Sequence, residues 1–291
     1  MYTNPNYMIN TNQYYWDQLD KPSRVDKLKE VQYLVASKEY RDFIPYCTCE
    51  LVPQIKFDTG IINNYPQVDV INNNPIDIIL DNRKEIKGFK IVVSHHVGEE
   101  FDGFRLPQMQ GIRDDIIFLR TNFISSFTLP NNNFPIKCEN DRVNSVYTPD
   151  VKILSNAHGE KFSPKGALIN FSLVTSVPIK NPELKPYKDK MGMTDDDVAK
   201  TMKIVDNIFQ IAIRGNVERK PIVLILSPFG NNEIDNNLVD DTIEIYNYFI
   251  CKYGHCIPNI IIAIPKNAQS NIFPAFQQGI LTRNYKQEIT K

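Results

Sequence analysis

Two loops of the sequence hold residues that could bind an anionic ligand. Residues 227–237 follow a short apolar run and lead into an expected helix, and residues 95–110 follow a second such run. The N-terminus of a helix carries free backbone N–H groups, which favour a phosphate or another anion. Because ligands of open α/β sheets sit beyond the carboxyl ends of the strands, both loops are candidates for one binding site.

Motifs of the common catalytic and metal-binding sites are absent from the chain. It has no Walker sequence, no G-x-G-x-x-G, no H-E-x-x-H and no G-x-S-x-G. Cys251, His255 and Cys256 lie close together, but no second cysteine or histidine pair has ligand spacing. We therefore expect ordinary buried thiols, no metal site and no cofactor.

Composition narrows the class of protein. The 33 basic and 34 acidic residues give a net charge of -1, which argues against generic nucleic-acid binding and against a polybasic membrane tether. The N-terminal residues do not have the pattern of a secretory signal, and the apolar runs are too short to span a membrane. Five cysteines, an odd number, favour reduced thiols. These observations predict a soluble cytoplasmic protein without membrane insertion.

Asparagine and isoleucine are abundant, and asparagines cluster at 72–74, 131–133 and 231–232. Both residue types have AT-rich codons, so we hypothesise a source with an AT-rich genome, such as a large DNA virus, a phage or a protist. A viral protein would lie in the host cytoplasm or the virion.

The second half of the chain has the pattern of an α/β fold. Apolar runs of strand length at 167–174, 222–226 and 260–264 are separated by helical patterns. The first helix is introduced by Thr194 with Asp197 three residues later, as in a capping box. The second is expected over 237–253 and to end at Gly254. Residues 221–265 then form a β-α-β unit with parallel strands and a helix on one face.

The first half is less regular. Apolar residues at helical spacing predict an amphipathic surface helix over 24–40, and strands are expected at 68–71 and 89–94, whereas 75–80 fits a strand or a short helix. No internal repeat or linker divides the chain. We predict an N-terminal extension, residues 1–20, and a single domain, residues 21–291.

Three segments carry a family resemblance. Residues 115–123, DIIFLRTNF, resemble the stretch after a Gln-Glu-Glu signature; residues 146–151, VYTPDV, are similar to Tyr-Ser-Pro-Asp-Val; and residues 226–234, LSPFGNNEI, align with Leu-Gly-Ala-Phe-Gly-Cys-Gly-Ala-Phe. Together, in this order and over about residues 24–265, they resemble the microbial-type poly(ADP-ribose) glycohydrolases, a branch of the macro-domain family. The resemblance implies a three-layer, macro-domain-like α/β fold, with a central mixed sheet and helices on both faces.

The same resemblance implies the site. Family members cleave the glycosidic bond of ADP-ribose, the second Glu of the signature acts on the leaving oxygen, and glycine loops cradle the diphosphate. Carried onto this sequence, the catalytic candidates are Asp115 and Asp114. The implied ligand-binding residues are Gly103, Phe229, Gly230, Asn231 and Asn232. We expect Asp115, Gly103, Phe229 and Gly230 to line one concavity.

The sequence departs from the family at the acid. Arg113, Asp114 and Asp115 stand where the family has Gln-Glu-Glu. Asp is one methylene shorter than Glu, and an acid must lie within hydrogen-bond reach of the reacting oxygen. Arg113 favours the ionised carboxylate, which is the wrong form for a proton donor.

Both glycine loops depart as well. The family's Gly-Gly-Gly run is reduced to Gly103, and Asn231 and Asn232 replace Cys and Gly. Glycine is needed where backbone approaches a ligand closely. Glu233 and Asp235 add negative charge where a diphosphate would bind.

Several residues fit more than one role. Asp114 and Asp115 either complement a helix dipole, which we favour, or contact a ligand. His95 and His96 end a strand, and we favour structural histidines. Phe229 could stack on a ribose or adenine or pack in the core, and Arg120 could anchor its helix to the sheet or bind an acidic partner.

Two functions remain open. The first, which we favour, is a degenerate, catalytically inactive macro-domain-like module. It binds a protein partner or serves as a structural component, for example of a viral assembly, and binds ADP-ribose weakly or not at all. The second is an ADP-ribosyl hydrolase with a remodelled site that uses Asp in place of Glu. Titration with ADP-ribose and a hydrolysis assay separate the two.

Overall fold

The structure is a computed structural model. It describes residues 19–44, 47–53, 66–98, 101, 115–128, 133–134, 136, 144–166, 168–179, 184–187, 190–217, 219–228, 236–266 and 271–281. Its strands are β1 (Glu50–Pro53), β2 (Gln67–Ile71), β3 (Lys90–His96), β4 (Asn144–Lys152), β5 (Asn170–Ser176), β6 (Leu184–Tyr187), β7 (Lys190–Met193), β8 (Ile222–Leu226) and β9 (Asn259–Ala263). Its helices are α1 (Lys21–Ala36), α2 (Lys38–Arg41), α3 (Pro75–Asp81), α4 (Asp115–Arg120), the 3₁₀ helix η3 (Asn122–Thr128), α5 (Asp195–Arg214), α6 (Asn236–Tyr253) and α7 (Ile272–Leu281).

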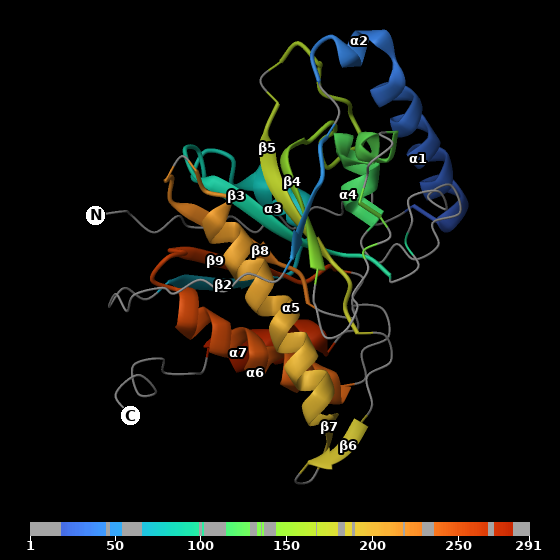
Figure 1. The fold of residues 1–291 in the computed structure, drawn as a ribbon. Helices are drawn as coiled ribbons and strands as arrows, with labels where there is room; N and C mark the ends of the chain where they lie inside the picture. The colour runs from blue at the N-terminus through green and yellow to red at the C-terminus, as the bar shows by residue number, and fades with distance from the viewer. Residues whose placement is uncertain are drawn as a thin grey trace.

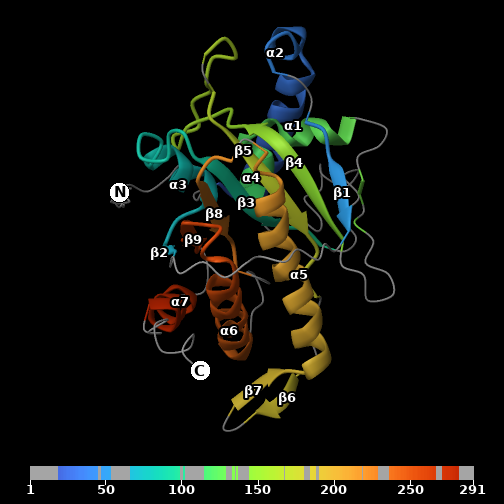
Figure 2. The same ribbon diagram turned by 60° about the vertical axis from the view of Figure 1, so that its left-hand side comes forward.

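A seven-stranded mixed sheet organises the fold, with the order β1-β4-β5-β3-β8-β9-β2 (Figure 2). The strands β5, β3, β8, β9 and β2 are parallel, whereas β4 is antiparallel to both β5 and β1. Strands β6 and β7 form a separate hairpin. The predicted parallel pairing of β8 with β9 is confirmed, with Leu224 opposite Ile260.

Helices cover both faces of the sheet, which gives the three layers expected (Figure 1). Helices α1, α3 and α4 pack on one face, and α5, α6 and α7 pack on the other. Strand β8 shows why both faces are apolar: Val223 and Ile225 enter the first core, and Ile222, Leu224 and Leu226 enter the second. Buried parallel strands have such continuous apolar runs.

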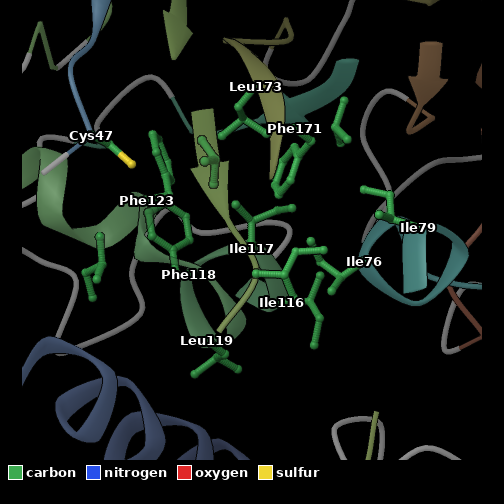
Figure 3. Close-up of a cluster of buried hydrophobic side chains, with 14 of the residues drawn as sticks. Cys47, Ile76, Ile79, Ile116, Ile117, Phe118, Leu119, Phe123, Phe171 and Leu173 are labelled. Carbon is green, nitrogen blue, oxygen red and sulfur yellow. The ribbon is translucent and has the colours of Figure 1, made fainter. Parts of the chain in front are cut away.

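The first core brings α4 against the sheet. Phe118 and Phe123 lie side by side with ring centroids 5.3 Å apart, and the side chains of α4 fill the space between β5 and α3 (Figure 3). Figure 3 also shows Leu119 pointing away from the sheet, toward α1. Helix α4 is therefore buried between the sheet and the outer helix.

The expected single helix at 24–40 is interrupted. Ser37 has an extended backbone, with φ -67° and ψ 148°, and it caps the end of α1 and the start of α2. Its hydroxyl oxygen accepts a hydrogen bond from the Tyr40 N–H group, which makes the second start favourable. The predicted burial of one face holds for Leu28 and Val31.

The caps and bounds of α3, α5 and β5 can be compared with the predictions from the sequence. Residues 75–80, left open between strand and helix, belong to α3, because Asn74 caps it and Pro75 occupies its first turn. Thr194 caps α5 as predicted, accepting a hydrogen bond from the Asp197 N–H group. The apolar run at 167–174 contributes to β5, which is shifted toward Ser176.

Gly254 follows α6, as predicted, for a reason that the sequence did not show. A Cβ atom at this position would lie 2.3 Å from Cδ of Pro66. The glycine thus permits close approach of Pro66, the residue that leads into β2.

Among the helices that the structure describes, none combines the length and the apolar character that a membrane span requires.

Candidate functional site

Most of the predicted site residues lie outside the described residues. These are Asp114, Gly103, Phe229, Gly230, Asn231 and Asn232. Asp115 is the first residue of α4. The prediction that these residues line one concavity therefore stays a prediction, and the flanking elements provide the geometry.

Helix α4 begins near the carboxyl end of β3. The ring of Phe118 packs edge-on against His95, with centroids 5.3 Å apart, and lies 5.4 Å from the ring of Phe101. At its other end, the chain after α4 forms a bridge between Thr121 and Ile153, beyond the end of β4 and beside the start of β5. Helix α4 thus runs back across the sheet, and its first residue, Asp115, lies near the edge where β3 ends.

The end of β8 is fixed by a second set of contacts. Ser94 Oγ accepts a hydrogen bond from the Ser227 N–H group at 2.9 Å. The Ser227 carbonyl oxygen lies 2.7 Å from the Tyr246 hydroxyl, which donates to it, and 3.1 Å from His96 Nε2. Side chains from β3 and α6 therefore hold the first residue of the loop that follows β8.

Burial keeps the tyrosine of this network in its donor form. Tyr246 is fully buried, and loss of solvation raises the pKa of its phenol far above the ordinary value. The neutral hydroxyl therefore donates to the Ser227 carbonyl oxygen at all physiological pH values.

Both histidines are part of the buried structure. His95 Nδ1 lies 3.2 Å from Thr175 Oγ1, and His96 Nδ1 lies 3.2 Å from Ser176 Oγ, both on the neighbouring strand β5. This geometry agrees with the structural role that we favoured. The contact of His96 with Ser227 was missed, because the sequence offers no signal for a partner so distant along the chain.

Arg120 is an internal anchor rather than a surface group. It is fully buried, and its Nη1 atom lies 2.7 Å from Oδ1 of Asp77 in α3. Asp77 is held in turn by Asn74, whose Nδ2 atom lies 2.6 Å from Asp77 Oδ2. Of the two roles left open, binding of an acidic partner does not fit a buried side chain. The pair with Asp77 joins α4 to α3, and Arg120 Nη2 also donates to the Ser155 carbonyl oxygen at 3.4 Å, in the segment that follows β4.

A pocket lies at the opposite edge of the sheet, where β3 begins and α5 ends. It has a volume of about 470 Å³. Nothing in the sequence pattern indicated it.

Within the described ranges, no group of three or more His, Cys, Asp or Glu residues is placed to hold a metal ion.

Comparison with known proteins gives a match in structure but not in sequence. No family model matches the chain, and no curated protein sequence matches it. The crystal structure of the poly(ADP-ribose) glycohydrolase of Thermomonospora curvata is similar, with a TM-score of 0.64 and 11% identity over 89% of this chain and 100% of that chain. The same enzyme bound to the inhibitor ADP-HPD gives a TM-score of 0.61 at 10% identity, over 88% of this chain and 98% of that one.

The Deinococcus radiodurans poly(ADP-ribose) glycohydrolase in complex with ADP-ribose is also similar. Its TM-score is 0.54 at 10% identity, over 90% of this chain and 93% of that one. Sequence identity as low as this shows that the folds are similar and shows nothing about activity. The chain therefore has the macro-domain-like α/β fold of the bacterial poly(ADP-ribose) glycohydrolases.

Proposed function

We propose that the protein is a degenerate macro-domain-like module that has lost glycohydrolase activity and acts through binding. Similar structures hold ADP-ribose or the inhibitor ADP-HPD. The fold thus supplies the framework of an ADP-ribose site, whereas the residues expected to perform the chemistry have changed.

The rigid placement of α4 carries this proposal. Asp115 begins a six-residue helix whose second half is fixed by the packing of Phe118 on His95 and by the buried pair of Arg120 with Asp77. A helix held in this way cannot advance to compensate for a carboxylate that is one methylene shorter than Glu. A misplacement of ~1 Å can lower a catalytic rate by roughly a hundredfold.

The loops add a second reason. Glu233 and Asp235 bring negative charge to the loop after β8, and Gly103 stands without glycine neighbours. Like-charge repulsion is stronger where water is partly excluded. We therefore expect weak binding of ADP-ribose and a protein partner as the main ligand. A structural role in a viral assembly is one setting in which such a module would act.

The alternative function is an ADP-ribosyl hydrolase that uses Asp115 as its acid. The fixed position of Ser227 favours it, because Ser94, His96 and Tyr246 still hold the base of the loop that would enclose the ligand. A site under no constraint to bind would not need this preorganisation.

Calorimetric titration with ADP-ribose, together with hydrolysis of an ADP-ribosylated protein, tests the proposal. We expect weak or no binding and no turnover. Asp115→Ala should change neither result, and Asp195→Ala, which alters the first residue of α5 in the same way, is the matched control. Turnover that Asp115→Ala abolishes and Asp195→Ala preserves would establish the hydrolase instead.

A further inference from the structure

We propose that the pocket at the amino edge of the sheet binds a small phosphorylated sugar. Its volume of about 470 Å³ lies in the range of small-molecule sites. Lys90 is the first residue of β3 and lines the pocket, whereas His96 is the last. At ~3.3 Å per residue the two ends of this strand lie roughly 20 Å apart. The pocket is therefore separate from the carboxyl-edge site and does not rest on the proposed function.

The pocket carries an excess of positive charge. Lys90, Arg214 and Lys220 line it, against the two carboxylates of Glu50 and Asp150. Among the described residues, no ion pair engages Lys90 or Arg214. Lys90 is half-buried, whereas Arg214 and Lys220 are exposed. A partly buried cation attracts an anion more strongly than an exposed one does, so Lys90 is the central cation of the three. The anionic part of the ligand is assigned to these three side chains.

The acceptors in the same pocket exclude a simple inorganic anion. Glu50 and Asp150 carry negative charge, and the pocket lies at the C-terminal end of α5, where backbone carbonyl oxygens give a partial negative charge. These groups repel an anion but accept hydrogen bonds from hydroxyl groups. A ligand that satisfies both sets carries a phosphate and several hydroxyls.

The position of one acceptor, Asp150, is set by a distortion of β4. The register of β4 with β5 shifts between Thr148 and Val151, and Asp150 has a φ of +56°. This backbone conformation is uncommon for a residue other than glycine and often marks a functional position. The bulge puts Pro149 and Asp150 on the wall of the pocket, where Asn170 Nδ2 donates to Asp150 Oδ1 at 3.0 Å.

An aromatic residue completes the wall. Tyr147 lies opposite Glu50 in the pairing of β4 with β1, and both line the pocket. The Tyr147 hydroxyl donates to Ser172 Oγ at 3.1 Å, and a Cβ atom on Gly215 would lie 2.8 Å from its oxygen. The ring is therefore held under the end of α5, where its apolar surface can face the carbon skeleton of a sugar.

Titration calorimetry of the full chain with ribose 5-phosphate, AMP, ribose and inorganic phosphate tests the proposal. We expect saturable binding of ribose 5-phosphate, of AMP or of both, with ribose and phosphate at least about tenfold weaker. Binding of AMP alone would narrow the ligand to nucleotides. Inorganic phosphate that binds as tightly as the sugar phosphates, or no saturable binding of either sugar phosphate, would overturn the proposal.

Substitutions in the pocket test whether the sugar phosphate binds there. Arg214→Gln and Glu50→Gln should each weaken it by about tenfold, the effect of losing one charge-assisted hydrogen bond. Arg83→Gln is the matched control, since Arg83 is exposed and does not line the pocket. Asp115→Ala should leave the affinity unchanged. Affinity that falls with Asp115→Ala and not with Arg214→Gln would place the ligand at the other edge and refute the assignment.

Discussion

His96 Nε2 lies 3.1 Å from the carbonyl oxygen of Ser227, a residue 131 positions later in the chain. The contact joins the ends of two neighbouring parallel strands, β3 and β8. The loops of the candidate site start from these two ends, so their relative position depends on this contact and on the hydroxyl of Tyr246.

Tyr246→Phe should lower the free energy of unfolding by about 1 to 2 kcal/mol, because it removes a buried donor from the Ser227 carbonyl oxygen. Urea denaturation measures the change. Tyr248→Phe is the control on the same helix, since the Tyr248 side chain is 52% exposed, and it should have little effect. Equal effects of the two substitutions would show that the hydroxyl of Tyr246 does not stabilise this loop base.

Arg120→Met should destabilise the protein by about 3 to 5 kcal/mol, because it leaves the charge of Asp77 buried without its partner. Adding Asp77→Asn to this variant should restore part of the loss, since the amide carries no charge. Lys200→Met, which breaks the exposed pair with Asp196, should cost less than ~1 kcal/mol. A double-mutant cycle measured by chemical denaturation gives these values. An Arg120→Met variant as stable as Lys200→Met would contradict the role of the anchor.

The central strands of the sheet could be predicted from the sequence, because each is a continuous apolar run of strand length. The run of β8, Ile222–Leu226, matches its predicted bounds, and β9 differs by one residue. Buried strands need apolar side chains on both faces, so the pattern survives without tertiary information. The break at Ser37 could not be predicted, because Lys38 and Glu39 after it still favour a helix and no proline or glycine marks the interruption.

The site could be predicted only in part, because its geometry depends on contacts between distant segments. Asp115 was expected near the start of a helix, and it begins α4. That Phe118 packs on His95, or that Tyr246 binds Ser227, follows from strand order and helix packing. The predicted ligand-binding residues rest on the family resemblance.

Gly254→Ala should destabilise the protein by about 1 to 3 kcal/mol, the usual cost of overpacking. The added Cβ atom would lie 2.3 Å from Pro66 Cδ and 2.6 Å from the Ile250 carbonyl oxygen, so backbone has to move. Thermal unfolding measures the loss. Gly166→Ala, whose Cβ would meet the Ser163 carbonyl oxygen at 3.2 Å, should cost less. The reverse order would show that Pro66 shifts without strain.

Cys47 should make the protein less stable at alkaline pH. Burial raises the pKa of its thiol to about 12, whereas a cysteine thiol in the unfolded chain has a pKa of about 8.5. The neutral thiol therefore contributes its full stability below the unfolded pKa, and this contribution declines as pH rises toward the folded value. Between pH 9 and 10 the protein should lose about 1 kcal/mol more than a Cys47→Ala variant. Parallel pH dependence in the two proteins, measured by denaturation under reducing conditions, would exclude this linkage.

Removing the negative charge and side-chain bulk from the loop after β8 should raise the affinity for ADP-ribose. Glu233→Ala combined with Asn232→Gly should do so by about tenfold, because repulsion falls and the backbone gains freedom to approach a diphosphate. Asp115→Glu alone should restore little activity, since a better acid cannot act on a ligand that is not held. Titration calorimetry and a hydrolysis assay measure both effects, with Glu39→Ala, an exposed charge change on α2, as the control. Micromolar binding of ADP-ribose by the unmodified protein, with turnover that Asp115→Ala abolishes, would show instead that the remodelled loop still encloses the diphosphate and that the shorter acid reaches the bond.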